Sequence, residues 1–233
     1  MKIFRHLLIS AAVIALGACA APHDGKPMDV RRELVSRGHN PTALAVLFVG
    51  NSYSFGVPKA FAKVAAERGK RATVGQVTHS GWSLARHAAN QETLRKIRER
   101  HWDVVVLQEQ SRLPSMPLRR TWRMAPNVRK LAAEIRKHGG IPVLYQTWGW
   151  RDGDPKRPHD DFHAMTSRVR EGYREAADKA GGLPVVAVGD VWQHEVSAGR
   201  GDGLFLPDGS HPTRRGDLLT AQAFCETFFG KAR

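Results

Sequence analysis

The stretch Val46-Leu47-Phe48-Val49-Gly50-Asn51-Ser52-Tyr53-Ser54 joins a continuous apolar run to a glycine and two serines. Apolar residues at successive positions are typical of a strand that is buried on both faces of a parallel sheet. Gly50 permits a sharp turn, which would place Ser52 where the chain enters a helix. There its hydroxyl faces a cleft beside free backbone N–H groups, although serine is also a common helix N-cap.

Similar runs and helical periodicities alternate along the rest of the chain. Strands are predicted at 44–49, 72–77, 104–108, 141–146 and 184–188, and helices at 57–68, 126–138, 161–180 and 213–229. The alternation predicts one α/β domain, a flavodoxin-like three-layer α/β/α sandwich with a parallel sheet of about five strands. Because ligands bind beyond the C-terminal ends of such strands, the loops at those ends are the ones to inspect.

The first residues have the pattern of an export signal. Lys2 and Arg5 precede an apolar run at 7–17, which is too short to span a bilayer as a stable helix, and the run ends at Leu16-Gly17-Ala18-Cys19. This end resembles a bacterial lipobox. We therefore expect a signal peptide at 1–18, lipidation of Cys19, a polar tether at 19–40 and the folded domain at 41–233.

This organisation predicts an exported lipoprotein that is held at a bacterial membrane by its N-terminal lipid, on the periplasmic side or at the outer membrane. An ordinary secretory signal with an incidental Cys19 is the alternative. Cys225 is the only other cysteine, so no disulfide framework is expected.

The formal net charge of +14 predicts a surface that attracts anions. For an exported protein these would be acidic polysaccharide, lipopolysaccharide, phospholipid headgroups or cell-wall polymer, and we expect no nucleic-acid partner. Simple solvated charge in an arginine- and alanine-rich chain is the other interpretation. The oligomeric state is left open.

A second polar segment, Pro207-Asp208-Gly209-Ser210-His211-Pro212, stands before the last helix. A serine nucleophile needs a base, and the base needs an acid that orients it. With the spacing Asp-x-x-His on a turn, the carboxylate can reach one ring nitrogen while the other faces the nucleophile. By itself the segment could equally be a turn followed by a helix cap.

Together these segments resemble the SGNH (GDSL-like) hydrolase family over about residues 44–229. Gly50-Asn51-Ser52 is similar to its first block, with Asn51 in place of the more usual Asp, and Ser80-Gly81-Trp82-Ser83-Leu84 is similar to its second. Asp208-x-x-His211 is similar to its last block. The resemblance implies ester hydrolysis through an acyl-enzyme, with Ser52 as nucleophile, His211 as base, Asp208 as orienting acid and the amides of Ser52 and Gly81 as oxyanion donors. It implies no cofactor.

The third block departs from the family pattern, in which an asparagine side chain donates to the oxyanion. Here the third strand ends in Gln108-Glu109-Gln110. A glutamine amide can donate the same hydrogen bond, so Gln108 or Gln110 is the expected substitute, and strand alternation does not decide between them. This departure keeps open a non-catalytic, polysaccharide-binding lipoprotein.

The substrate is expected to be an acylated glycan, with O-acetyl groups removed from carbohydrate. Trp82, Trp148, Trp150 and Asn51 are the candidate substrate-binding residues, although packing is an equal explanation for each tryptophan and at most one of Trp148 and Trp150 should face the site. A lipase or lysophospholipase is the rival enzyme. The acyl group and the polymer stay open.

A metal is not expected. His159 and His163 are four residues apart, as in zinc sites, but Asp stands in place of the Glu of the zinc-protease motif and no third ligand is evident. A solvated helix start is the favoured interpretation.

Overall fold

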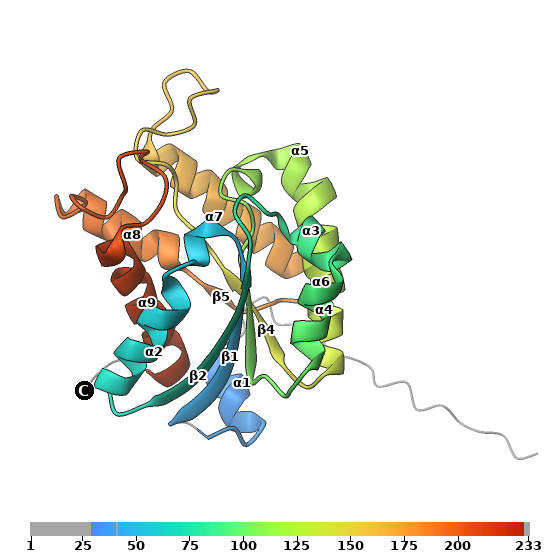
Figure 1. Ribbon diagram of the computed structural model, residues 1–233. Helices are drawn as coiled ribbons and strands as arrows, with labels where there is room; N and C mark the ends of the chain where they lie inside the picture. The colour runs from blue at the N-terminus through green and yellow to red at the C-terminus, as the bar shows by residue number, and fades with distance from the viewer. Residues whose placement is uncertain (1–28, 41, 231–233) are drawn as a thin grey trace, which may run out of the picture.

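The computed structural model describes residues 29–40 and 42–230. The predicted signal peptide, Cys19 and residues 20–28 of the predicted tether lie outside the described residues. Five strands form one parallel sheet in the order β2-β1-β3-β4-β5, which is the flavodoxin-like order (Figure 1). They are β1 (Ala43–Gly50), β2 (Arg71–Thr78), β3 (Val104–Leu107), β4 (Ile141–Tyr145) and β5 (Val185–Val186). The predicted fold class is confirmed.

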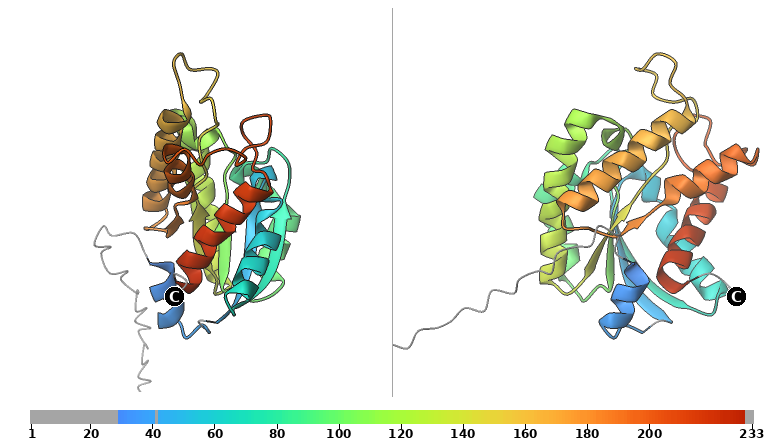
Figure 2. Two further views of the ribbon diagram at one scale, coloured as in Figure 1. Left: turned by 90° about the vertical axis from the view of Figure 1, so that its left-hand side faces the viewer. Right: turned by 180° about the vertical axis from the view of Figure 1, so that it is seen from behind.

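Helices cover both faces of the sheet (Figures 1 and 2). One side carries α1 (Val30–Ser36), α2 (Val57–Glu67), α8 (Val188–Ser197) and α9 (Arg214–Phe229). The other carries α3 (Leu84–Ala89), α4 (Gln91–Arg98), α6 (Ala125–Lys137) and α7 (Phe162–Lys179). A short α5 (Pro117–Arg119), 3-10 turns at Ser52–Ser54 and Leu113–Ser115, and a π-helical turn at Arg120–Met124 complete the chain.

The core is divided in two by the sheet, because successive strand side chains point to opposite faces. In β1, Val46 and Phe48 join the cluster under α2 and α9, whereas Leu47 and Val49 join the cluster under α3 and α6. The strands β3 and β4 divide their side chains in the same way. Both faces are therefore apolar, which explains the continuous apolar runs of the sequence.

The structure differs from the predicted elements where tertiary contacts override local pattern. β2 is an edge strand and is half-exposed rather than buried on both faces. β5 pairs over only two residues, and Val188, predicted as its end, instead begins α8. The unpredicted α3 and α4 have six and eight residues, too short for a clear periodic signal.

The predicted start of the domain at residue 41 is wrong, because α1 belongs to the fold. Asp29 caps this helix by accepting from the N–H groups of Arg31 and Arg32. Val30 and Leu34 are buried in the cluster that contains α9. The folded domain therefore includes the residues from Asp29 onward.

Among the residues described, no helix combines the length and the apolarity that crossing a membrane requires.

Leu34→Ala is expected to lower the free energy of unfolding by about 2 kcal/mol, because a buried leucine is lost and a cavity remains. Val35 is the matched control, since it is 58% exposed whereas Leu34 is 4% exposed. Val35→Ala should change the free energy by less than about 0.5 kcal/mol. Urea denaturation followed by circular dichroism measures both, and equal midpoints would show that α1 does not contribute to the fold.

Candidate active site

Ser52 stands on a tight turn at the C-terminal end of β1. This strand lies between β2 and β3, where the order of the strands in the sheet changes direction. Asn51 caps the 3-10 turn by accepting from the N–H of Tyr53 at 3.1 Å. His79 N–H donates to the carbonyl of Gly50, which joins the end of β1 to the end of β2. The half-buried Ser52 side chain is thereby placed at the edge where ligands bind in this fold.

A buried glutamine amide supports this turn. Gln108, at the end of β3, accepts through Oε1 from the Asn51 N–H at 2.8 Å and from Ser54 Oγ at 3.1 Å. A Cβ at position 50 would lie 2.5 Å from that same Oε1, so only glycine fits there. Gly50 and Gln108 are therefore structurally dependent on each other.

The loop before α9 brings His211 to Ser52. Ser52 Oγ lies 2.9 Å from His211 Nε2, and His211 Nδ1 lies 2.6 Å from Asp208 Oδ2. Asp208 Oδ1 also accepts from the N–H groups of Ser210 and His211, at 2.9 and 3.0 Å. Since a carboxylate only accepts, neutral His211 carries its proton on Nδ1 and presents Nε2 as acceptor to the serine hydroxyl.

Asp208 is suited to stay ionised in this arrangement. Burial raises the pKa of Asp208, but hydrogen bonds from the backbone of His211 and Ser210 and from the His211 ring outweigh it, so the pKa lies below the ordinary value. The side chains of His211 and Asp208 are 38% and 48% exposed. The hydrogen-bonded chain is therefore open to solvent on one side.

Trp148 supports the His211 loop rather than facing a ligand, so its predicted substrate role is wrong. It is fully buried between Tyr53 and Trp192, with ring centroids at 4.9 and 3.6 Å, and its Nε1 donates to the Ser210 carbonyl. Tyr53 contacts the His211 ring edge-on and hydrogen-bonds to Ser210. Burial raises the pKa of Tyr53 to about 12, which keeps its hydroxyl protonated.

Asn51 is likewise structural, and its predicted contact with substrate is wrong. The residue is buried, and its amide Nδ2 donates to the carbonyls of Trp82 at 3.0 Å and Glu109 at 3.4 Å. Since its Oδ1 caps its own turn, all of its polar side-chain atoms are used, and the amide joins the end of β1 to the segments that follow β2 and β3. Of the other predicted substrate residues, Trp82 is half-exposed against His79, and half-exposed Trp150 has its Nε1 3.4 Å from Ser111 Oγ.

Gly81 lies in the exposed loop between β2 and α3, with φ +69°. Among the residues described, neither its N–H nor that of Ser52 donates a hydrogen bond. Hydrogen bonds from three buried side chains hold the loop. Asn51 donates to the Trp82 carbonyl, and His87 Nε2 donates to the Gly50 carbonyl (2.8 Å). Glu109 accepts from the Leu84 N–H (3.1 Å). Burial lowers the pKa of His87 to about 4, so the ring is neutral and donates from Nε2.

Glu109 was not assigned a role by the sequence, yet it caps α3 where Ser83 provides no side-chain cap. Its Oε1 accepts from the N–H groups of Leu84 and Gln110, while its Oε2 is buried with no partner among the described residues. Burial raises the pKa of Glu109 to about 7, and the two backbone hydrogen bonds offset that effect only in part. The signal that could have identified it is a carboxylate at the end of a buried strand.

The two glutamines differ in what they can offer an oxyanion. Gln108 is fully buried, and its Nε2 donates to the Glu109 carbonyl, so the prediction that it donates to the oxyanion is wrong. Gln110 is half-buried, and its Oε1 accepts from the N–H groups of Arg112 and Leu113. Its Nε2 has only a long 3.4 Å contact with Ser111 Oγ, which leaves that donor available.

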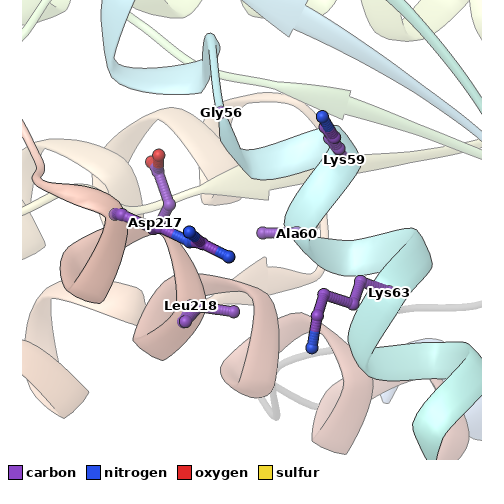
Figure 3. Close-up of a pocket in the computed structure, with 7 residues that line it drawn as sticks. Gly56, Lys59, Ala60, Lys63, Asp217 and Leu218 are labelled. Atoms are coloured by element: carbon purple, nitrogen blue, oxygen red, sulfur yellow. The ribbon is translucent and has the colours of Figure 1, made fainter.

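A groove of about 400 Å³ separates α2 from α9, the helices that follow Ser52 and His211 in the chain (Figure 3). Lys59, Lys63 and Arg214 line it, and Asp217 points toward Gly56 at its upper end. Burial raises the pKa of Asp217 to about 6. The rim of the groove is therefore cationic.

His159 and His163 do not come together as ligands. His159 lies in the exposed loop before α7, with φ 56°, and His163 Nδ1 contacts Gln193 at 3.2 Å.

Replacing Glu109 should change the pH dependence of stability. The folded pKa of about 7 exceeds the ordinary 4.5, so the folded state keeps a proton that the unfolded state loses between these values. The stability that wild type gains from this proton is complete below pH 4.5 and is lost as the pH rises through 7. The free energy of unfolding of wild type minus that of Glu109→Gln should fall by about 3 kcal/mol between about pH 4.5 and 8. Urea titrations across this range measure it, and parallel pH curves for the two proteins would contradict it.

The sequence matches no protein-family profile, and it matches no curated protein. Solved structures do resemble it. A protein from Slackia heliotrinireducens, described as a candidate SGNH hydrolase, is 28% identical with a TM-score of 0.65, over 79% of this chain and 98% of that one. A DUF4886 family protein from Bacteroides uniformis is 18% identical with a TM-score of 0.72, over 81% of this chain and 84% of that one. A lipase/acylhydrolase from Enterococcus faecalis is 15% identical with a TM-score of 0.58, over 82% and 98% of the two chains.

The last two likenesses concern the fold, whereas the first also rests on sequence. The chain therefore has the fold of the SGNH (GDSL-like) hydrolases, and its sequence blocks follow one another along the parallel sheet in the order in which they resemble the blocks of that family.

Proposed function

We propose that the protein hydrolyses carboxylic esters through an acyl-enzyme on Ser52. The observation that carries this proposal is the hydrogen-bonded chain from Ser52 Oγ to His211 Nε2, at 2.9 Å, and from His211 Nδ1 to Asp208, at 2.6 Å. In this order the side chains match the requirements of nucleophile, base and orienting acid.

In the proposed reaction, His211 Nε2 takes the Ser52 proton as Oγ attacks the ester carbonyl carbon. The Asp208 carboxylate stabilises the imidazolium that results. His211 then gives the proton to the leaving alcohol, which breaks the ester bond and leaves the acyl group on Ser52. Water activated by His211 releases the acid and restores Ser52.

The oxyanion of the tetrahedral intermediates would be held by the N–H groups of Ser52 and Gly81, with Gln110 Nε2 as a third donor. The free amides and the available Gln110 amide support this assignment. Each such donor typically contributes about 3–4 kcal/mol to stabilising the transition state.

We further propose that the substrate is an O-acetylated, acidic carbohydrate, and that the protein acts as a membrane-anchored lipoprotein outside the cytoplasm. The open His211–Asp208 side of the site suits an ester that projects from a polymer. The cationic groove between α2 and α9 suits acidic sugar units, and half-exposed Trp82 beside Gly81 suits a sugar ring.

A longer acyl chain is the second candidate, and a specific observation favours it. Phe55 and Leu206 are exposed apolar side chains close in sequence to Ser52 and Asp208. Such residues would contact the tail of a lipid ester rather than a sugar.

Ser52→Ala and His211→Ala are each expected to lower kcat for p-nitrophenyl acetate by at least about 10³-fold, because each removes a required member of the chain. Ser167→Ala and His194→Ala, on exposed helical surfaces, are the matched controls and should retain wild-type rates. Initial rates with folding checked by circular dichroism measure this. Equal rates in all five proteins would remove Ser52 as the nucleophile.

The substrate proposal predicts charge selectivity. Lys59→Ala and Arg214→Ala should each lower kcat/KM on an O-acetylated uronate-containing polysaccharide about fivefold, the effect of losing about 1 kcal/mol of attraction, with p-nitrophenyl acetate turnover unchanged. Lys130→Ala, exposed on α6 on the other side of the sheet, is the control. Acetate release measured at two salt concentrations checks this result. Rapid turnover of p-nitrophenyl octanoate with no release from the polymer would favour the lipid ester instead.

A further inference from the structure

Two imidazoles and one carboxylate meet at the end of the sheet opposite Ser52. His39 follows α1, and His101 and Asp103 precede β3. One ligand atom from each lies within 4.8 Å of the other two. The group stands at the N-terminal ends of β1 and β3, and the length of β1 puts it about 23 Å from the catalytic edge.

Asp103 is held rigidly by the sheet. Its backbone N–H donates to the Ala45 carbonyl at 2.9 Å, and its own carbonyl accepts from Ile141 at 3.0 Å. In addition, the Ala45 N–H donates to Asp103 Oδ2 at 2.6 Å. These contacts orient the carboxylate and leave Oδ1 directed at the two histidines, as outer hydrogen bonds orient the ligands of metal sites.

Both histidines approach that same oxygen. His39 Nδ1 lies 2.7 Å and His101 Nε2 lies 3.5 Å from Asp103 Oδ1. The two rings are stacked, with centroids 5.8 Å apart and planes inclined by 9°. A Cβ at Gly139 would lie 3.2 Å from the His101 ring, so the glycine leaves room for the imidazole. An ion pair would need only one histidine beside this carboxylate, whereas here two imidazole nitrogens approach the same fixed oxygen.

We propose that His39, His101 and Asp103 bind one Zn²⁺ ion, with water as the fourth ligand. Zinc bonds of about 2.0–2.1 Å in tetrahedral geometry separate neighbouring ligand atoms by about 3.3 Å. The His101–Asp103 distance already agrees with this value, and His39 needs to withdraw by about 0.6 Å. Two imidazoles with one carboxylate suit zinc better than Mg²⁺ or Ca²⁺, which prefer oxygen ligands.

Binding would replace the hydrogen bond between His39 Nδ1 and Asp103 Oδ1 with bonds from both atoms to the metal. The neutral imidazole then carries its one proton on Nε2 instead of Nδ1. The side chain of His101 is 57% exposed and that of Asp103 is 16% exposed, so the ion can enter from solvent and keep a water. Arg37, on the same segment as His39, is paired with Glu33 at 2.7 Å, which limits its repulsion of a cation.

The bound ion would fasten the segment after α1 to the start of β3, and so hold α1 against α9. Its effect is therefore on stability rather than on ester hydrolysis, and the inference does not depend on the proposed function. Untagged protein is required, since an added histidine tag would bind zinc by itself.

Isothermal titration of the metal-stripped protein with ZnCl₂ should show one site. Zinc at about 100-fold above the Kd should raise Tm by roughly 5–10 °C. Co²⁺ in place of zinc should give the visible absorption of a tetrahedral site. His39→Gln and His101→Gln should each lose the site and the Tm increase, whereas His194→Gln, an exposed histidine outside the group, should retain both.

Asp103 is left unchanged, because its carboxylate also holds Ala45 and its loss could unfold the edge. If a glutamine variant folds poorly, the Co²⁺ spectrum of wild type with and without competing zinc still decides. Absence of a one-to-one site in wild type, or equal zinc binding in all three variants and wild type, would overturn the proposal.

Discussion

The edge of the sheet that carries Ser52 depends on one buried amide, the side chain of Gln108. It accepts from the Asn51 N–H and Ser54 Oγ beneath the serine turn and donates to the Glu109 carbonyl. An amide is one of the few side chains that can satisfy donors and acceptors together in a site without water. A carboxylate or an apolar side chain there would leave buried polar groups unpaired, at a cost of about 1–3 kcal/mol each.

The site consists of two halves supported in different ways. The half with Ser52 and Gly81 rests on buried polar residues that join the ends of three strands. The half with His211 rests on stacked rings, since Trp148 lies between Tyr53 and Trp192 and donates to the Ser210 carbonyl. Tyr53 follows Ser52 in the chain and packs against Trp148 and His211, so it contacts both halves of the site.

Much of this could be predicted from sequence, because the signals are local. The five apolar runs predict buried parallel strands, and the segments at Ser52 and His211 were recognisable by their order and strand context. The function of Gln108 and the burial of Trp148 were not predictable, because they depend on which strand end faces which neighbour. The same is true of Glu109, and of the contact between His39 and Asp103, which joins residues far apart in the chain.

The departure in the third block now has a physical explanation. Of the two glutamines expected to replace the family's asparagine, Gln108 faces inward beneath the serine turn, and the neighbouring Glu109 caps α3. In the proposed mechanism the oxyanion is therefore held mainly by the backbone amides of Ser52 and Gly81, and the position of the second amide depends on how firmly the loop at Gly81 is held. A carboxylate that accepts from the first turn of α3 restrains that loop without entering the cleft. In the proposed mechanism Gln110 is thus the one side chain that donates directly, and the buried residues hold the backbone donors in place.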